Sequence, residues 1–299
     1  MPRLTPRLRP VLLALLAVAA IVLAAFAAVV GLVWWGQERI VFQPPGGFAA
    51  WDAADGHVTR KVAYRAADGQ QLCAFVVRPQ RTAAQPARRE PIVAPRGVVI
   101  VFHGNADLAT SWIGWGGEVA ERTGLTVVAA EYRGYGGLPG TPTYEGSKLD
   151  ARAAYAYVRD SMGARPEQIA IYGHSLGSAI GAELAAEVRP HALVLEAPFT
   201  SARAMARIVV VRPVTALWGV ISRVHYDTEA RVRALDVPVH VAHGERDRVI
   251  PVHMGRAVHA AARVKGGLLV VPDAGHNDVQ ETADEGYWRW LEAALGAAR

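Results

Sequence analysis

Apolar residues in this chain form one long run near the N-terminus and a series of short runs that follow it at intervals. The long run covers residues 11–35 and contains no charged residue. At about 1.5 Å rise per residue, a helix of this length spans the roughly 30 Å hydrocarbon core of a bilayer with some tilt. The run therefore predicts a transmembrane helix.

Positive charge precedes that run. Arg3, Arg7 and Arg9 lie before it, whereas the charges of Glu38 and Arg39 cancel after it. Because cationic flanks stay in the cytoplasm, we expect a cytoplasmic tail at 1–10, a signal anchor at 11–35, and the rest of the chain outside the cytoplasm, in the periplasm of a bacterial cell. A cleaved signal peptide is the alternative, but its apolar region normally spans about 7–15 residues.

The short runs predict strands that alternate with helices. Runs at 58–64 and 72–77 flank the turn-forming Ala67-Asp68-Gly69 and are expected to pair as an antiparallel hairpin. Further strands are expected at 98–102, 126–130, 169–172, 192–195, 237–241 and 268–271. Helix-length segments separate them, so the pattern predicts an α/β fold with a mostly parallel sheet covered by helices on both faces.

Turn-forming residues divide the rest of the chain. Pro44-Pro45-Gly46-Gly47 marks 36–56 as a connector, so that the globular domain covers 57–299, and prolines make 78–96 an exposed loop. Thr141 and Pro142 predict the cap and first residue of a helix that runs through 156–159. A final helix is expected to place three residues in the core at helical spacing: Trp288, Leu291 and Leu295.

Composition narrows the classes of protein. The chain has 299 residues, of which 52% are hydrophobic, enough for one large α/β domain and an appendage. Its net charge of +5 comes from scattered arginines without a basic block, so no nucleic-acid partner is expected. The single cysteine, Cys73, excludes an internal disulfide and a cysteine-based metal site.

Residues 169–178 contain a motif with a mechanical role. The strand expected there runs into Gly173-His174-Ser175-Leu176-Gly177, which is a G-x-S-x-G pattern, and a helix is expected from 176 to about 188. In such a turn the serine has strained backbone angles, and its flanking glycines keep side chains out of the crowded bend. The motif therefore predicts a serine hydroxyl that is presented for reaction.

A serine hydroxyl needs a base, because it is a poor nucleophile at neutral pH. In parallel sheets, ligands gather beyond the carboxyl ends of the strands. His276 follows the last expected strand and is the candidate base. Asp247 follows the preceding strand and is the candidate acid that orients His276. Glu196, which follows the strand at 192–195, is the alternative acid, and we favour Asp247 because its loop can reach farther.

Two backbone amides are expected to form an oxyanion hole. The turn His103-Gly104-Asn105-Ala106 follows the strand at 98–102 and can direct the Asn105 N–H at Ser175, and the Leu176 N–H is the second donor. One such donor typically contributes about 3–4 kcal/mol in the transition state. His103 is expected to have a structural role in this turn.

No metal or cofactor is expected. His240, His243 and His253 lack a carboxylate pair at ligand spacing, which favours structural or surface roles for them. Gly134-Tyr135-Gly136-Gly137 is only loosely similar to a phosphate-binding loop, because no helix opens directly behind it.

Together these motifs resemble the α/β-hydrolase superfamily, and within it the Bem46-like group of membrane-anchored serine hydrolases. The resemblance implies that Ser175, Asp247 and His276 take the nucleophile, acid and base positions, and that 201–236 forms a small cap. Two residues depart from the group: Glu131 replaces its usual aspartate, and Asp107 replaces a glycine in the oxyanion loop. The matching segments are 37–42, 103–106, 132–136, 173–177, 197–201, 243–244 with Asp247, and 275–276.

We therefore expect a membrane-anchored serine hydrolase that cleaves a carboxylic ester or thioester through an acyl-enzyme intermediate, with a small-molecule acyl substrate of lipid-like character. Amide cleavage by the same residues is the nearest alternative. A non-catalytic, membrane-tethered binding protein is the alternative from another class, because a fold alone does not imply activity. Apolar residues at 208–211 and 216–221 suggest either an acyl channel or the core of a cap helix.

Overall fold

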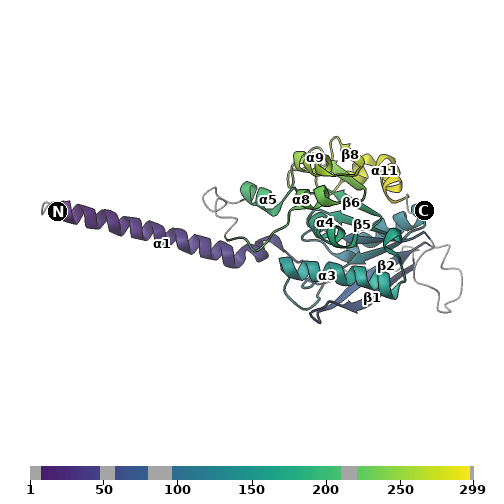
Figure 1. Ribbon diagram of the computed structural model, residues 1–299, viewed down its shortest axis with the longest axis horizontal. Helices are drawn as coiled ribbons and strands as arrows, with labels where there is room; N and C mark the ends of the chain where they lie inside the picture. The colour runs from purple at the N-terminus through teal and green to yellow at the C-terminus, as the bar shows by residue number, and fades with distance from the viewer. Residues whose placement is uncertain (1–7, 48–57, 80–95, 210–220, 297–299) are drawn as a thin grey trace.

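The computed structural model describes residues 8–47, 58–79, 96–209 and 221–296. Within these ranges, one long helix projects from a domain in which a sheet is flanked by helices (Figure 1). The loop expected at 78–96 and the apolar cap residues 210–211 and 216–220 fall almost entirely outside the described residues.

The described strands form a single eight-stranded sheet in the order β1-β2-β4-β3-β5-β6-β7-β8. β1 pairs antiparallel with β2, and β2 pairs antiparallel with β4, whereas every other neighbouring pair is parallel. The mostly parallel sheet and its leading hairpin are thus confirmed. The strands are β1 Val58–Arg65, β2 Gln71–Arg78, β3 Val98–Phe102, β4 Thr126–Ala130, β5 Ile169–His174, β6 Ala192–Glu196, β7 Val239–Gly244 and β8 Lys265–Val271.

Helices cover both faces of this sheet, which explains why β3, β4 and β5 are buried along their whole length. One face packs against α3 Tyr144–Ala156, α4 Leu176–Val188, α8 Thr228–Ala234 and α9 Val252–Ala261. The other face packs against α2 Ile113–Thr123, α10 Val279–Ala283 and α11 Glu285–Leu295. On α11, the expected core residues Trp288, Leu291 and Leu295 are buried, as predicted.

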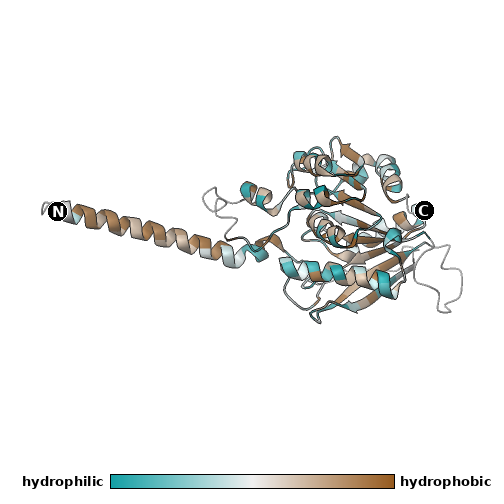
Figure 2. Cartoon of the chain, in the orientation of Figure 1, coloured by the Kyte–Doolittle hydropathy of each residue, from teal (hydrophilic) through white to brown (hydrophobic). Residues whose placement is uncertain are grey.

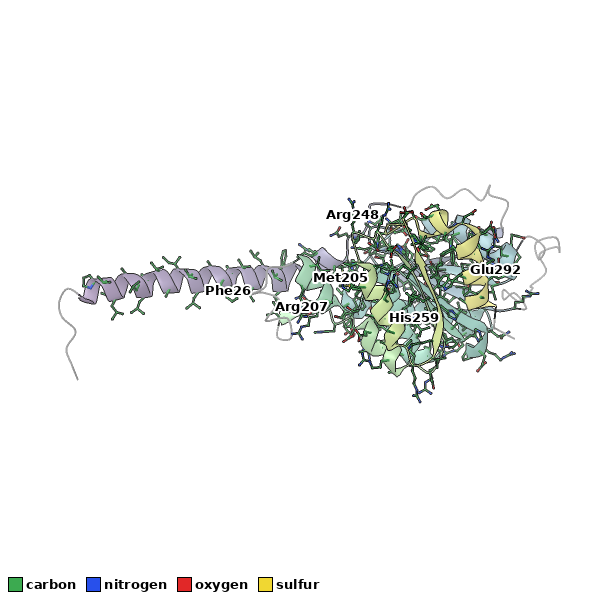
Figure 3. All side chains as sticks on the ribbon, turned by 90° about the horizontal axis from the view of Figure 1, so that it is seen from above. Phe26, Met205, Arg207, Arg248, His259 and Glu292 are labelled. Atoms are coloured by element: carbon green, nitrogen blue, oxygen red, sulfur yellow. The ribbon has the colours of Figure 1, made fainter. Side chains whose placement is uncertain are left out.

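The first helix, α1 Leu8–Val41, is the part of the molecule that stands away from the domain. Most of its length consists of apolar residues (Figure 2), and Phe26 lies on it far from the sheet (Figure 3). From Pro10 to Val41 it is long and apolar enough to cross a membrane, a test that a signal sequence also passes.

Helix α1 continues beyond Trp35, into the segment that the sequence assigned to the connector. The helix passes through Gly36, and the turn that follows this glycine is bound to the domain. Gln37 Nε2 donates to Ile221 O over 2.9 Å, and Gln37 Oε1 accepts from Arg223 N over 2.6 Å. Arg223 also forms an ion pair with Glu38, at 3.0 Å. The last turn of the apolar helix is therefore fixed to the domain.

The start expected for α3 is wrong by two residues. The cap is Thr143, not Thr141, and Tyr144 is the first helical residue, so Pro142 lies outside the helix. The reason is local: the Thr143 side chain accepts a hydrogen bond from Gly146 N over 2.9 Å, which satisfies a free donor of the first turn. After Ala156 the chain continues through a wider π-helical turn, Tyr157–Ser161.

The region expected to form a cap contributes two short helices within the described residues. Residues 197–201 separate β6 from helix α5 Ala202–Val209, and α8 leads the chain back toward β7. Ile208 on α5 is exposed.

Candidate active site

Ser175 lies at the bend between β5 and α4, with φ 52° and ψ −115°. A non-glycine residue in this region is strained and needs support from its surroundings. Ser175 N donates to Glu196 O over 2.9 Å, and Ser175 O accepts from Ser178 N over 3.0 Å. These bonds hold the serine at the carboxyl edge of the sheet.

The two glycines of the bend are required by space. A Cβ on Gly173 would overlap the carbonyl of Gly177, and a Cβ on Gly177 would overlap the carbonyl of Phe102 on β3. Helix α4 can therefore approach the sheet closely only with these residues, as the motif predicted.

The three side chains singled out in the sequence form one hydrogen-bonded series. His276 Nε2 lies 3.0 Å from Ser175 Oγ, and His276 Nδ1 lies 2.7 Å from Asp247 Oδ2. His276 comes from the loop after β8, and Asp247 comes from the loop after β7. The sheet order places β5, β6, β7 and β8 side by side, which brings the three loops to the same edge.

Asp247 is buried and receives several hydrogen bonds. Its Oδ1 accepts from Val249 N and Ile250 N, both over 2.8 Å, and His243 Nε2 lies 3.2 Å from its Oδ2. Burial tends to raise the pKa of this carboxyl, but hydrogen bonds from His243, His276 and Ile250 outweigh it and hold the pKa well below its usual range. Asp247 is thus ionised where it meets the imidazole.

His243 was expected to be structural or at the surface, and its contact with Asp247 was not foreseen. It is fully buried, and its Nε2 also lies 2.8 Å from Ile250 O. The signal available in the sequence was its position four residues before Asp247, at the end of the same strand. His240, two residues earlier, instead accepts a hydrogen bond from Gly267 N over 2.9 Å. No group of three or more metal-ligating side chains occurs in the described part of the chain.

Glu196, the alternative acid, makes other contacts. Its Oε2 accepts hydrogen bonds from Tyr172 OH and from Tyr287 OH, the latter over 3.1 Å. These phenols lie on the face of the sheet that is covered by α2 and α11. The structure thus brings Asp247, and not Glu196, to His276.

The turn after β3 is fixed by buried polar contacts. His103 Nε2 lies 2.8 Å from Glu131 Oε1, and its carbonyl accepts from Tyr132 OH over 2.9 Å. Burial lowers the pKa of His103, but the hydrogen bond and charge of Glu131 outweigh it and raise that pKa. Asp107, which departs from the resembling group, accepts from Trp112 Nε1 over 2.8 Å. It thereby connects the turn to the start of α2.

Asn105 and Leu176, the two expected amide donors, both lie close to Ser175 in the chain or in space. Asn105 lines the cavity at the serine, together with Gly104 and Ala106. Leu176 is the first residue of α4, where a backbone N–H has no acceptor within its own helix. The Asn105 side chain has a separate set of bonds that sequence reasoning missed: it contacts Val41, Gln43 and Tyr135.

A cavity of about 570 Å³ opens at the serine. Its lining includes Ser175 and His276, together with the aromatic residues Trp112, Trp115 and Tyr287. Glu196 reaches the same cavity. The site can therefore hold a small organic molecule beside the serine hydroxyl.

The sheet order, the bend after β5 and the acid and histidine after β7 and β8 define an α/β-hydrolase fold. The chain has this fold, and a family model described as "alpha/beta hydrolase fold" matches its residues 97–216. It is 32% identical over 273 residues to the uncharacterized protein Rv2307c of Mycobacterium tuberculosis, and the match covers 88% of each chain.

Two further comparisons concern named hydrolases. The mouse lysophosphatidylserine lipase ABHD12 is 28% identical over 200 residues, which cover 58% of this chain and 47% of that protein. The esterase Pf2001 of Pyrococcus furiosus superposes with a TM-score of 0.64 at 19% identity, covering 85% of this chain and 99% of that one. At this identity the superposition shows a shared fold.

Proposed function

We propose that this chain is a membrane-anchored serine hydrolase of the Bem46-like group, which cleaves a carboxylic ester or thioester through an acyl-enzyme intermediate. The observation that carries the proposal is the unbroken series from Ser175 Oγ through the His276 ring to Asp247, with contacts of 3.0 and 2.7 Å. Each contact lies within the range that proton transfer requires.

In the first half of the reaction, Ser175 Oγ attacks the substrate carbonyl carbon while His276 Nε2 takes its proton. Asp247 stabilises the resulting imidazolium and fixes its orientation. The negative charge develops on the carbonyl oxygen, to which the Asn105 and Leu176 amides donate. The tetrahedral species then collapses, the bond to the alcohol or thiol breaks, and His276 returns the proton to that leaving group.

In the second half, water attacks the acyl-serine ester. His276 removes a proton from the water, the same amides hold the oxyanion, and collapse breaks the bond to Ser175 Oγ. The serine recovers its proton from His276, and the carboxylic acid leaves. No cofactor is required for either half.

The membrane part of the proposal concerns α1. Residues 11–35 would cross the bilayer, with the tail at 1–10 in the cytoplasm and the hydrolase domain on the other side. The exposed apolar surface of α1 supports this assignment. A site next to a bilayer favours a lipid-like acyl substrate, and the activity named for the mouse relative, a lysophosphatidylserine lipase, points the same way.

Labelling by an active-site-directed fluorophosphonate tests the chemistry. We expect the full chain in membranes to be labelled, and Ser175→Ala and His276→Ala to lose the label. Ser161→Ala, at an exposed serine of the π-helical turn, is the matched control and should be labelled like the wild type. Equal labelling of the wild type and Ser175→Ala would falsify the nucleophile assignment.

Hydrolysis of p-nitrophenyl esters and of the matching anilides separates the remaining classes. Ester turnover that depends on His276 supports the esterase proposal. Faster anilide turnover indicates an amidase, and the absence of any turnover indicates a binding protein.

A phosphatase fusion after residue 296 tests the orientation of α1. We expect the fused phosphatase to be active, because the phosphatase reaches its active form only outside the cytoplasm. An inactive fusion beside an active cytoplasmic reporter at the same position would place the domain in the cytoplasm.

A further inference from the structure

Glu196 is a buried carboxylate beside the proposed nucleophile whose contacts the mechanism does not use. It pairs with His174 in the parallel register of β5 and β6, and only 5% of its surface is exposed. Tyr172 OH and Tyr287 OH both donate to its Oε2. Trp115 Nε1 donates in turn to Tyr287 OH over 3.0 Å.

The hydroxyls of Tyr172 and Tyr287 also lie 2.9 Å apart, and whichever of them donates to the other, the series of donors ends at Glu196. Burial and the negative charge of Glu196 raise the pKa of both Tyr172 and Tyr287 well above the usual value, so the phenols stay protonated. An indole N–H is only a donor, so the Tyr287 oxygen accepts from Trp115 and directs its own proton onward. The whole network therefore points toward one oxygen of Glu196.

The second carboxylate oxygen of Glu196 is left for a ligand. Within the described ranges no donor bonds to its Oε1, and this oxygen is not among the buried atoms that lack a partner, so it keeps some accessible surface. Glu196 also lines the cavity that contains Ser175. This oxygen can therefore bind a group that enters the cavity and either donates a hydrogen bond or carries a positive charge.

The rest of the cavity wall favours a cation. Asp107 and Glu281 also line it, and none of the described residues that line it is a lysine or an arginine. Trp112 and Trp115 also line it, and their ring centroids are 5.3 Å apart. Aromatic faces next to a carboxylate are the arrangement that proteins use to bind organic ammonium groups.

We propose that Glu196, Trp112, Trp115 and Tyr287 form a subsite for an alkylammonium group on the alcohol part of the ester substrate. The alcohol is assigned because it must leave next to His276, which returns the proton to it. Tyr287 and His276 both come from the segment after β8, and both line the cavity. This inference rests on the proposed esterase function and specifies its substrate class.

A pair of substrates with one acyl group tests the subsite. Butyrylthiocholine carries a quaternary ammonium, and 3,3-dimethylbutyl thiobutyrate is its uncharged isostere. For the full chain in detergent we expect kcat/KM to be about ten-fold or more higher for the cation, as befits a contact with a charged group. In Glu196→Gln the ratio of the two kcat/KM values should fall toward one. A loss of folded enzyme lowers both kcat/KM values by the same factor, so it does not change their ratio.

Glu281→Gln is the matched control, because Glu281 lines the same cavity but is exposed at its rim. It should keep most of the preference for the cation. An equal loss in both variants indicates only a general negative potential and overturns the subsite. So does a wild-type ratio near one, or a Glu196→Gln ratio equal to that of the wild type.

A binding measurement separates this inference from the proposed function. Ser175→Ala cannot form an acyl enzyme, and titration with butyrylcholine, followed by the fluorescence of the cavity tryptophans, reports binding alone. We expect saturable binding that is weakened about ten-fold in Ser175→Ala/Glu196→Gln. If this holds while the wild type hydrolyses no ester, the hydrolase proposal fails and the subsite stands. If esters are hydrolysed but the second substitution does not weaken binding, the subsite fails alone.

Discussion

The side chain of Asn105 binds the backbone of Val41, so the turn beside Ser175 is joined to the last turn of the apolar helix. Asn105 Nδ2 donates to Val41 O over 2.7 Å, and Asn105 Oδ1 accepts from Gln43 N and from Tyr135 OH, both over 2.8 Å. Phe42, between the two backbone partners, is 3% exposed and belongs to the core. The segment that leaves α1 is therefore a part of the site's support.

Two truncations distinguish an anchor from a support. A chain that begins at residue 36 keeps Gln37, Val41, Phe42 and Gln43, and we expect it to fold and to hydrolyse p-nitrophenyl esters at a rate near that of the full chain. A chain that begins at residue 44 loses the contacts of Asn105 and the buried Phe42, and large apolar truncations in a core cost about 3–5 kcal/mol. We expect this shorter chain to be unstable and at least ten-fold less active. Similar activity of both truncated chains would contradict the supporting role.

Substitution of Asn105 tests the same link without truncation. Asn105→Ala removes three hydrogen bonds, each contributing on the order of 1 kcal/mol, and releases the turn that carries one proposed oxyanion donor. We expect kcat to fall about ten-fold or more with a smaller change in KM. Tyr135→Phe removes a single one of these bonds and should have a much smaller effect. Equal loss in both variants would assign the effect to the Tyr135 hydroxyl bond alone and not to the bonds with Val41 and Gln43.

Gly177 and Gly114 provide a matched pair, because each is the second residue of its helix. A Cβ on Gly177 would overlap the carbonyl of Phe102, whereas a Cβ on Gly114 meets no atom within 4 Å. Gly177→Ala should therefore destabilise the protein by several kcal/mol, as expected for overpacking that displaces backbone. Gly114→Ala should be neutral or stabilising by up to about 1 kcal/mol, because alanine is the better helix former. Urea unfolding of both variants is the measurement.

Asp247→Asn removes the charge that the mechanism needs on the imidazole. We expect kcat to fall by roughly 10³–10⁴-fold, as is typical when this carboxylate is neutralised in a serine triad. The variant should still fold and keep His276 beside Ser175, so labelling by the fluorophosphonate should become slower but not disappear. A loss of less than about ten-fold would assign the acid role to another group.

The same substitution predicts a dependence of stability on pH. The pKa of Asp247 in the folded state lies below its unfolded value of about 3.9. The ionised carboxylate therefore stabilises the fold at pH values above the unfolded pKa. This stabilisation is lost as the pH falls toward the folded-state pKa. Asparagine does not titrate. The difference in the free energy of unfolding between wild type and Asp247→Asn should thus be constant above about pH 5 and shrink below about pH 4. A difference that is unchanged at pH 3 would argue against a depressed pKa.

The sequence predicts the sheet well and the contacts between distant segments poorly. Short β-branched runs locate every described strand to within a few residues, because buried parallel strands must be apolar throughout. The positions of Ser175, Asp247 and His276 follow from the ends of those strands. The cap of α3 was misplaced because Thr141 and Thr143 are both plausible caps, and only the fold shows which hydroxyl reaches a free amide.

Other contacts have no local signal. The bonds of Asn105 to Val41 join residues 64 positions apart, and those of Gln37 to Ile221 join residues 184 positions apart. The role of Glu196 depends on Tyr287, 91 positions away. Such pairings become visible only when the sheet brings its strand ends together.

The hydrogen bonds and the ion pair that join Gln37 and Glu38 to Ile221 and Arg223 affect how the protein meets its substrate. If α1 crosses a bilayer, this rigid junction keeps the mouth of the pocket at a constant height and tilt above the lipid surface. A flexible linker would instead let the domain reorient freely. With the rigid junction, molecules that diffuse laterally within one leaflet would meet the serine through a search in two dimensions, whereas a freely dissolved ester must arrive from the bulk.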